Sequence, residues 1–418
     1  MGGFCVKTLV LGQSKSGIAA AKLLAAQGHD VYLSEYNAVE SVILPGVKVE
    51  TGGHTDAFWQ GAELAVASPG IPPHAPILQK IKSTGIELIS EIELAWRSNT
   101  GTDWIAITGT NGKSTTTALV AHILGETPCG NYGLPPSDLR TDTFVCEVSS
   151  FQLELSPTFA PKIAVWTNFA PDHLDWHGSL ENYFNAKAGM FERAQFAVLN
   201  AKDPRLKGFT PGGKVFWFGA KDYTDAIYFE NEKIIDLTDC PIFGEHNYQN
   251  IEAAVICAKI QGISTEKIRK KIMSFKAPEH RLERCGEGQM GQITFYNDSK
   301  ATNPEAAIVA IKSFANKDVV LIAGGRDKNT DLAEFCEAVK NHVKTVILIG
   351  EAAERFEKNL TASGFTNIKR AATMEAAVDI GVGLNPDVVL LSPACASFDM
   401  FGSYEERGKV FKNYVRGK

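Results

Sequence analysis

The segment with the clearest chemical signature is 109–115, Gly-Thr-Asn-Gly-Lys-Ser-Thr, which follows the apolar run 104–108. A strand that ends in a glycine-rich turn and opens into a helix, here predicted over 116–124, is built to hold phosphate groups. The turn directs backbone N–H groups into one concavity, and the helix N-terminus adds about half a positive charge. Lys113 would then reach the β- and γ-phosphates of a nucleotide, and a hydroxyl at one of the next two positions would meet Mg²⁺. The loop residues predicted to bind nucleotide are Gly109, Thr110, Asn111, Gly112, Lys113, Ser114 and Thr115.

This loop departs from the strict P-loop pattern at one position. That pattern requires a glycine at position 107, where this chain has Ile107, and it has a glycine at 109 instead. The segment is therefore a variant of the phosphate-binding loop. A lysine-bearing turn with two glycines and no ligand is the alternative, and the order of strand, turn and helix argues against it.

Two further positions in the middle of the chain carry groups that could serve a metal–phosphate site. Glu147 sits near the end of the apolar strand predicted over 144–148, which is where a Mg²⁺-holding carboxylate is needed beside a phosphate loop. His173 and His177 are four residues apart, but a zinc protease motif requires a glutamate at position 174, where this chain has Leu174. The pattern favours His173 in the Mg²⁺ and phosphate region, with a surface histidine as the alternative. By composition alone, Lys187 is an ordinary solvated lysine.

The first third of the chain contains a second glycine-bearing turn directly after a strand, at 11–17. It is similar to the dinucleotide-binding fingerprint, but Ser14 replaces the middle glycine, so a nicotinamide cofactor is disfavoured. Glu35, at the end of the next strand, could meet a ribose hydroxyl, and the turn 67–71 would face the same crevice. A tight turn without ligand is the alternative. The candidate nucleotide-type contacts here are Ser14, Lys15, Ser16, Glu35, Ser68 and Gly70.

In the last third, polar loops follow the predicted strands and would meet at the carboxyl edge of one sheet, where open α/β sheets bind ligands. These loops are 297–303, 324–328 and 392–397. They supply ammonium groups and hydroxyls that suit a small molecule bearing carboxylates, from Lys300, Lys328, Thr302 and Ser397. Cys395 has no histidine near it in sequence, so it is interpreted as a small packing residue.

Strands alternate with helices three times along the chain, which predicts an α/β protein with parallel sheets. Polar, glycine-bearing composition at 97–103 suggests a linker. We therefore expect three domains: a Rossmann-like domain over 1–98, a central P-loop ATPase domain over 99–278 and a Rossmann-like domain over 279–418.

Composition narrows the class of protein further. The 418 residues are 44% hydrophobic and carry a net charge of −6, so no basic surface for nucleic acid is expected. We expect neither a membrane span nor a signal peptide. The eight cysteines are scattered singly, which predicts reduced thiols in the cytoplasm. We expect the chain to be a monomer.

Taken together, the motifs resemble the Mur ligases, the ATP-dependent amide ligases of bacterial peptidoglycan synthesis. The loop without the leading glycine is the form found in that superfamily and in folylpolyglutamate synthetases. Four other segments are similar to the D-glutamate-adding branch: 147–154 (Glu-Val-Ser-Ser-Phe-Gln-Leu-Glu), 278–281 (Pro-Glu-His-Arg), 297–303 (Asn-Asp-Ser-Lys-Ala-Thr-Asn) and 392–399 (Ser-Pro-Ala-Cys-Ala-Ser-Phe-Asp). The resemblance covers essentially the whole chain, and it departs at 34–36, where Ser-Glu-Tyr replaces an Asp-Thr-Arg-like segment.

The resemblance implies ATP, two Mg²⁺ ions, UDP-N-acetylmuramoyl-L-alanine and D-glutamate as ligands. It implies catalytic roles for Lys113, His173 and Lys187, the last as a lysine carbamylated by CO₂. The implied metal ligands are Ser114, Glu147, His173 and Lys187. The implied further ATP contacts are Asn247, Asn250, Arg281 and Asp298, and Asn131 would approach the muramoyl substrate. The implied D-glutamate contacts are Lys300, Thr302, Lys328, Ser397, Phe398 and Tyr404.

The implied reaction activates a carboxylate with ATP as an acyl phosphate, which an amine then attacks through a tetrahedral intermediate. Other readings stay open at this point. The chain could be another Mur ligase or a folylpolyglutamate synthetase, or a non-catalytic regulator that binds a UDP-sugar or ATP.

Overall fold

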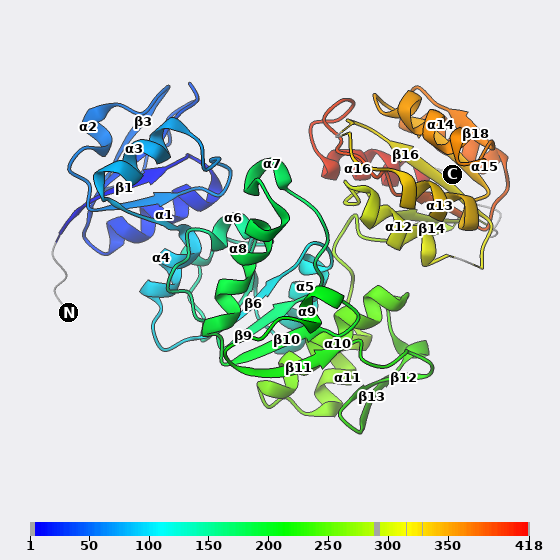
Figure 1. Ribbon diagram of the computed structural model, residues 1–418, viewed down its shortest axis with the longest axis horizontal. Coiled ribbons are helices and arrows are strands. Elements are labelled where there is room, and N and C mark those ends of the chain that lie inside the picture. The colour runs from blue at the N-terminus through cyan, green and yellow to red at the C-terminus, as the bar shows by residue number, and fades with distance from the viewer. Residues whose placement is uncertain (1–4, 288–292, 315, 328, 417–418) are drawn as a thin grey trace. The chain divides into compact units, whose positions relative to one another are not determined.

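The computed structural model describes residues 5–287, 293–314, 316–327 and 329–416 (Figure 1). The chain forms two compact units. The first comprises Met1–Pro241 and Asn247–Phe275, and the second comprises Ile242–His246 and Lys276–Lys418. The first unit holds two large parallel sheets and the second holds one mixed sheet, so the predicted α/β architecture with three domains is confirmed.

The first sheet is parallel throughout and has the strand order β3-β2-β1-β4-β5. Its strands are β1 Lys7–Leu11, β2 Asp30–Glu35, β3 Val47–Thr51, β4 Leu64–Ala67 and β5 Glu87–Ser90. Apolar residues cover both faces because helices pack on both sides. These helices are α1 Lys15–Ala26, α2 Asp56–Trp59, α3 Pro76–Thr84 and α4 Glu91–Ser98. This is the Rossmann-like arrangement expected for the first third.

The order of the strands reverses between β1 and β4, which are hydrogen-bonded neighbours. Such a switch point leaves a crevice at the carboxyl ends of the two strands. Helix α1 begins there, with Ser14 as its N-cap, and Oγ of Ser14 lies 3.0 Å from Oγ of Ser68 in the turn after β4. The two turns predicted to share one crevice are therefore in direct contact.

The central sheet has the order β11-β10-β9-β6-β8-β7, and all its strands are parallel. The strands are β6 Asp103–Thr108, β7 Pro128–Gly130, β8 Thr143–Glu147, β9 Ile163–Trp166, β10 Phe196–Asn200 and β11 Lys214–Phe218. One face buries a dense aromatic cluster in which Trp104 stacks on Phe144, and Trp166 stacks on Phe191 from α8 Leu180–Arg193. The helix α5 Lys113–Leu124 contacts β6, β7 and β8.

The remaining elements of the first unit are shorter or lie outside the central sheet. They are η1 Pro136–Asp138, α6 Ser150–Leu153, α7 Leu174–His177, α9 Pro204–Lys207, the hairpin β12 Ala226–Phe229 and β13 Glu232–Asp236, η2 Leu237–Asp239, α10 Glu245–Ile260 and α11 Thr265–Met273. Of α10, the first unit contains the residues from Asn247 onward. Ser149 caps α6 with a capping box, because its hydroxyl accepts from the backbone N–H of Gln152 and the Gln152 side chain accepts from the backbone N–H of Ser149.

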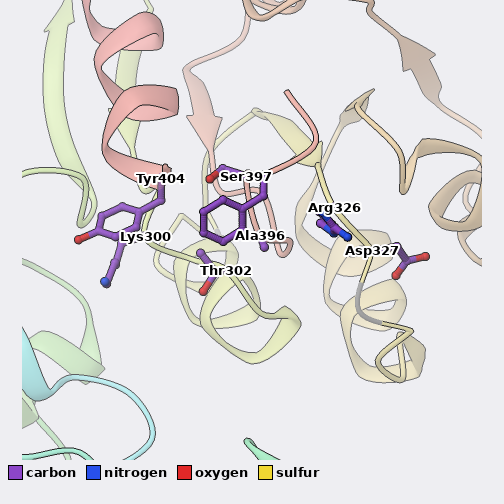
Figure 2. Close-up of a pocket in the computed structure, with 8 residues that line it drawn as sticks. Lys300, Thr302, Arg326, Asp327, Ala396, Ser397 and Tyr404 are labelled. Carbon is purple, nitrogen blue, oxygen red and sulfur yellow. The ribbon is translucent and has the colours of Figure 1, made fainter. Parts of the chain in front are cut away.

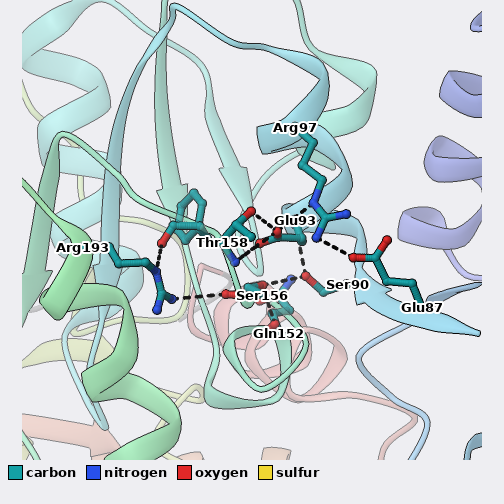
Figure 3. A network of polar contacts seen from close by, with 9 residues as sticks. Glu87, Ser90, Glu93, Arg97, Gln152, Ser156, Thr158 and Arg193 are labelled. Atoms are coloured by element: carbon teal, nitrogen blue, oxygen red, sulfur yellow. Dashed lines mark hydrogen bonds and ion pairs between the residues drawn. The ribbon is translucent and has the colours of Figure 1, made fainter. Parts of the chain in front are cut away.

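A buried polar network ties the first domain to the central one (Figure 3). The Glu93 carboxylate of α4 is fully buried, accepts a hydrogen bond from Arg97 Nε at 2.8 Å and accepts the backbone N–H and the hydroxyl of Thr158. The Ser90 hydroxyl lies 2.8 Å from that of Ser156, whose own backbone carbonyl accepts from Arg193 of α8. The residues 97–103, predicted to be a linker, include the end of α4, and only residues 99–102 separate that helix from β6.

The sheet of the second unit has the order β14-β15-β19-β16-β17-β18, with β14 antiparallel and the other pairs parallel. The strands are β14 Glu283–Glu287, β15 Thr294–Asn297, β16 Val319–Gly324, β17 Thr345–Ile349, β18 Ile368–Arg370 and β19 Val388–Leu391. Helices α12 Pro304–Lys312, α13 Ala333–His342 and α14 Ala353–Ala362 cover one face, and α15 Met374–Gly383 and α16 Tyr404–Val415 cover the other. Alternate residues of β16 enter the two cores, as its period of two requires.

Candidate functional site

The phosphate loop lies between β6 and α5, and its two glycines adopt backbone conformations that other residues rarely take. Gly109 has φ 146°, and a Cβ there would meet the Thr167 hydroxyl at 1.9 Å. Gly112, the N-cap of α5, has φ 83°, and a Cβ there would meet Asn250 Oδ1 at 2.7 Å. Glycine is therefore required at both positions, by backbone conformation and by space.

Neighbouring strand ends hold this loop in place. The Asn168 side chain accepts from the backbone N–H of Asn111 at 2.8 Å and donates to its carbonyl at 3.0 Å. The backbone carbonyl of Asn168 accepts from the N–H of Thr110, and the Thr167 hydroxyl donates to the Asn111 carbonyl. The loop is thus preorganised by hydrogen bonds to the residues after β9.

Lys113, the first residue of α5, folds back over the loop. Its Nζ donates to the carbonyls of Gly109 at 2.9 Å and Thr110 at 2.8 Å. The ammonium group therefore lies above the concavity, where the phosphates of a nucleotide would be placed.

Lys187 is not the solvated lysine that its helix composition predicts. It is 1% exposed, and its Nζ donates to Thr108 Oγ1 at 3.1 Å and to the Gly109 carbonyl at 3.3 Å. Burial, and after it the Lys113 ammonium, lower the pKa of the Lys187 amine well below its ordinary value. Packing of α8 against the sheet buries Lys187. The pattern of apolar and polar residues along this helix does not by itself reveal that burial.

Glu147 ends β8 and lies buried at 2% exposure. Its Oε1 accepts from Asn131 Nδ2 at 2.7 Å, whereas its Oε2 is buried without a hydrogen-bond partner among the described residues. A buried carboxylate oxygen without a partner is unfavourable unless a ligand satisfies it. A cation at this oxygen would meet that need.

Over the described parts of the chain, no group of three or more His, Cys, Asp and Glu side chains is arranged to hold a metal ion. Mg²⁺ is usually held by one or two carboxylates together with substrate phosphates and water. Glu147 Oε2 and the buried Ser114 hydroxyl fit such an ion.

The two histidines considered for zinc have different surroundings. His177 is buried, with Nε2 2.9 Å from the Ser150 hydroxyl and Nδ1 2.8 Å from Glu154 Oε1, so both ring nitrogens are engaged. His173 has a left-handed backbone with φ 53°, a side chain that is 43% exposed and its ring against Phe151. Of the pair, His173 has the accessible ring.

Two asparagines of α10 lie beside the phosphate loop, although they are more than a hundred residues away in sequence. Asn250 Oδ1 accepts from the Thr116 hydroxyl of α5 at 3.1 Å, and its amide donates to Asn247 Oδ1 at 3.4 Å. Both are buried, at 6% and 8% exposure. The structure thus places Asn250 next to Gly112 and Asn247 against Asn250.

In the first domain, the predicted contacts gather around the switch-point crevice. Glu35 accepts the backbone N–H of Gln13 at 2.8 Å and the backbone and side-chain N–H groups of Asn37 at 2.9 Å. The pKa of Glu35 is lowered, because these hydrogen bonds outweigh its partial burial. Ser14 is exposed at the mouth of the crevice and also lies 3.0 Å from Ser16.

The second unit contains a pocket of about 390 Å³ at the carboxyl edge of its sheet (Figure 2). It is lined by Lys300, Thr302, Arg326, Asp327, Ala396, Ser397, Phe398 and Tyr404. The three loops predicted to form one site do so, and each contributes to the lining. Lys300 Nζ lies 3.8 Å from the centre of the Tyr404 ring, a cation–π contact. Lys328 lies outside the described residues.

Arg407 of α16 was not predicted as part of this site, yet it organises the pocket walls. It is 1% exposed, and its guanidinium donates to Ser299 Oγ at 2.9 Å, to the Ser299 carbonyl at 2.8 Å and to the carbonyls of Cys395 and Ala396 at 3.1 and 3.2 Å. One cation thus joins the loop after β15 to the loop after β19. In sequence it is one charge among many in a polar helix, and nothing there marks it as buried.

Asp298 and Cys395 illustrate burial in the same loops. Asp298 accepts from the Ser392 hydroxyl at 2.8 Å and from the N–H of Leu282, and burial raises the pKa of its carboxyl to about 7. Burial raises the pKa of the Cys395 thiol to about 12, so the packing interpretation of this residue agrees with its surroundings. Arg281, predicted near the nucleotide, is half-buried.

All eight cysteines are free, and five of them are buried: Cys129, Cys146, Cys257, Cys336 and Cys395. Within the described ranges, every helix is too short or too polar to traverse a bilayer.

Three family profiles match this chain in order. Residues 6–90 match the MurD-like N-terminal domain of Mur ligases, residues 134–258 the Mur ligase middle domain, and residues 280–395 the Mur ligase glutamate ligase domain.

Curated relatives match over nearly the full length. The chain is 40% identical to a UDP-N-acetylmuramoylalanine--D-glutamate ligase from Acidobacterium capsulatum, covering 98% of this chain and 96% of the relative. It is 39% identical to a protein of the same name from Trichodesmium erythraeum, with the same coverage.

Solved structures share the fold at lower identity. The UDP-N-acetylmuramate-alanine ligase MurC from Thermotoga maritima is 18% identical, with a TM-score of 0.64, over 99% of this chain and 100% of that one. The MurF ligase from the same organism, solved in complex with ADP, is 16% identical, with a TM-score of 0.61, over 98% and 95% of the two chains.

Proposed function

The chain belongs to the Mur ligases, within them to the UDP-N-acetylmuramoylalanine--D-glutamate ligase family, and we propose that it joins D-glutamate to UDP-N-acetylmuramoyl-L-alanine with the conversion of ATP to ADP and phosphate. The product is a precursor of peptidoglycan. Because the reaction consumes ATP, we place it in the cytoplasm.

The observation that carries this proposal is the convergence of three groups around one loop. The Lys113 ammonium lies over the loop, the buried Lys187 amine contacts it, and Glu147 presents an oxygen without a partner among the described residues. A protein that only binds a nucleotide needs the loop, but it does not need a buried amine and a buried carboxylate beside it. This is the specific argument for a catalyst over a regulator.

Each group has a proposed task in the reaction. Lys113 and the loop N–H groups bind and orient the phosphates as charge moves onto the leaving ADP. Glu147 and Ser114 would hold Mg²⁺, which neutralises phosphate charge when bound. The lowered pKa of Lys187 leaves more of its amine neutral, the form that reacts with CO₂, so carbamylation of Lys187 is chemically favoured. The carbamate would be a second anionic oxygen donor beside Glu147.

The amine of D-glutamate must be neutral to attack the acyl phosphate, and His173 is the proposed base that accepts its proton. Its side chain is 43% exposed, and its left-handed backbone is uncommon for a residue other than glycine, as at many active sites. The switch-point crevice of the first domain is proposed to hold the UDP group, and the pocket of Figure 2 to hold D-glutamate.

The test is release of phosphate from ATP in the presence of UDP-N-acetylmuramoyl-L-alanine and a panel of amino acids. We expect release with D-glutamate, and not with L-alanine, L-lysine or meso-diaminopimelate. Lys113→Ala should abolish turnover, whereas Lys207→Ala, an exposed lysine of the same unit, should retain it. Release with L-lysine but not with D-glutamate would contradict the proposed substrate, and activity of Lys113→Ala would contradict the proposed ATP site.

A further inference from the structure

The pocket in the second unit has one cation that the predicted contacts do not include, Arg326. Its side chain is exposed to the pocket, and among the residues that the structure describes none accepts a hydrogen bond from its guanidinium. In Figure 2 it lies between Ser397 and Asp327, apart from Lys300 and Tyr404. The pocket is therefore lined by a cation from each of two different loops.

The carboxylate of the neighbouring Asp327 does not neutralise the charge of the Arg326 guanidinium. Asp327 forms a two-pronged ion pair with Arg355, from Nε to Oδ2 at 2.5 Å and from Nη2 to Oδ1 at 2.7 Å. Both oxygens of this carboxylate already accept from a guanidinium. The described lining of the pocket is thus net positive, which suits a ligand that carries two carboxylates.

The backbone of Arg326 is anchored beside Ser397. Its N–H donates to the Ala396 carbonyl at 2.9 Å, and the two residues form an isolated antiparallel bridge. Gly325 precedes it with φ 136°, and a Cβ there would meet the same carbonyl at 2.3 Å, so glycine permits this close approach. Arg407 also donates to that carbonyl, at 3.2 Å. The base of the Arg326 side chain is therefore well fixed.

We propose that the Arg326 guanidinium binds one of the two carboxylates of the amino-acid substrate and thereby selects a dicarboxylic amino acid. The inference rests on the proposed function and deepens it. A guanidinium presents two parallel N–H groups that match a carboxylate, and because this planar fork is pre-organised, less freedom is lost per hydrogen bond formed. Selection follows because an analogue that lacks the carboxylate leaves the guanidinium without its anionic partner.

The experiment compares full-length wild type, Arg326→Gln and Arg326→Lys in phosphate release, with D-glutamate and ATP varied separately. Arg370→Gln, an exposed arginine of the same unit, is the matched control. Hydrogen bonds to charged groups contribute about 1.5–3 kcal/mol, which corresponds to an increase of roughly 10- to 150-fold in the KM for D-glutamate of Arg326→Gln. The KM for ATP should stay within about twofold, and Arg326→Lys should recover part of the loss because it keeps the charge.

A second measurement separates binding from a structural role. D-Glutamine lacks the side-chain carboxylate and 4-aminobutyrate lacks the α-carboxylate. Wild type should prefer D-glutamate to both, and Arg326→Gln should lose most of the preference against one of them, which identifies the carboxylate bound. An unchanged KM for D-glutamate in a folded Arg326→Gln variant, or undiminished preference against both analogues, would overturn the inference. Inactivity of wild type with D-glutamate would instead overturn the proposed function.

Discussion

The two glycines that flank α5 allow a matched test of how the phosphate loop is built. Gly112 and Gly125 have nearly the same φ, 83° and 86°, at opposite ends of one helix. They differ in space, because a Cβ at Gly112 would meet Asn250 Oδ1 at 2.7 Å, whereas a Cβ at Gly125 would meet nothing within 4 Å. Replacement by alanine therefore imposes similar backbone strain at both positions, but a steric conflict only at Gly112.

The magnitudes follow from that difference. An alanine with left-handed backbone costs about 1–2 kcal/mol, and this is the whole effect expected for Gly125→Ala. Gly112→Ala adds displacement of Asn250 and with it the hydrogen bond from the Thr116 hydroxyl, at about 1 kcal/mol, together with about 1 kcal/mol or more for the overlap. The effect of alanine on the unfolded chain is similar in both variants and cancels in the comparison.

The assay is thermal unfolding of both variants together with calorimetric titration of Mg·ADP. Gly125→Ala should bind ADP like wild type. Gly112→Ala should unfold at the lower temperature and bind ADP at least about tenfold more weakly, which corresponds to about 1.4 kcal/mol, because the loop N–H groups move with the displaced backbone. Equal losses of stability and of ADP affinity in the two variants would refute the reasoning, since the contact with Asn250 would then contribute nothing.

Two further predictions concern buried charge. The Glu91 carboxylate accepts the Ser137 N–H, and burial raises its pKa from 4.5 to about 7. Because the folded state then binds the proton more tightly than the unfolded state, wild type should lose stability relative to Glu91→Gln as the pH rises from about 5 to 8. Urea unfolding at several pH values measures this difference, and a difference that does not change with pH would contradict it. Arg407→Met removes four hydrogen bonds to the pocket loops and leaves buried carbonyls without a donor, so it should destabilise the second unit by about 3–5 kcal/mol, against roughly 0.5 kcal/mol or less for Arg370→Met at the surface. Equal melting temperatures of these two variants would show that Arg407 does not hold the loops.

Much of the architecture could be read from local patterns in the chain. Helix α5 was predicted over 116–124 and begins at Lys113, and the strand predicted over 144–148 is β8 Thr143–Glu147. Such agreement is expected because apolar periodicity and turn residues act within a few positions. The beginning of α5 was less accurate, since its N-cap, Gly112, has no side chain to mark it.

Some residues of the candidate sites could likewise be predicted from the sequence, and others could not. Residues at strand ends were found because parallel strands bring their carboxyl ends to one edge, so the lining of the pocket in Figure 2 contains Lys300, Thr302 and Ser397 as predicted. Lys187 and Arg407 escaped this reasoning. Both are charged residues on helices of mixed composition, and the sequence pattern predicts a solvated face for such residues.

Sequence order and residue type therefore account for the three α/β domains, the phosphate loop and the polar edge of each sheet, because these depend on short-range pattern and on the geometry of parallel strands. Tertiary packing accounts for the rest. It buries the Lys187 amine against Thr108, leaves Glu147 Oε2 without a partner among the described residues, and brings Arg326 beside Ser397. Those properties depend on which surfaces of distant segments meet, and desolvation and hydrogen bonding at such contacts act only once the chain has folded.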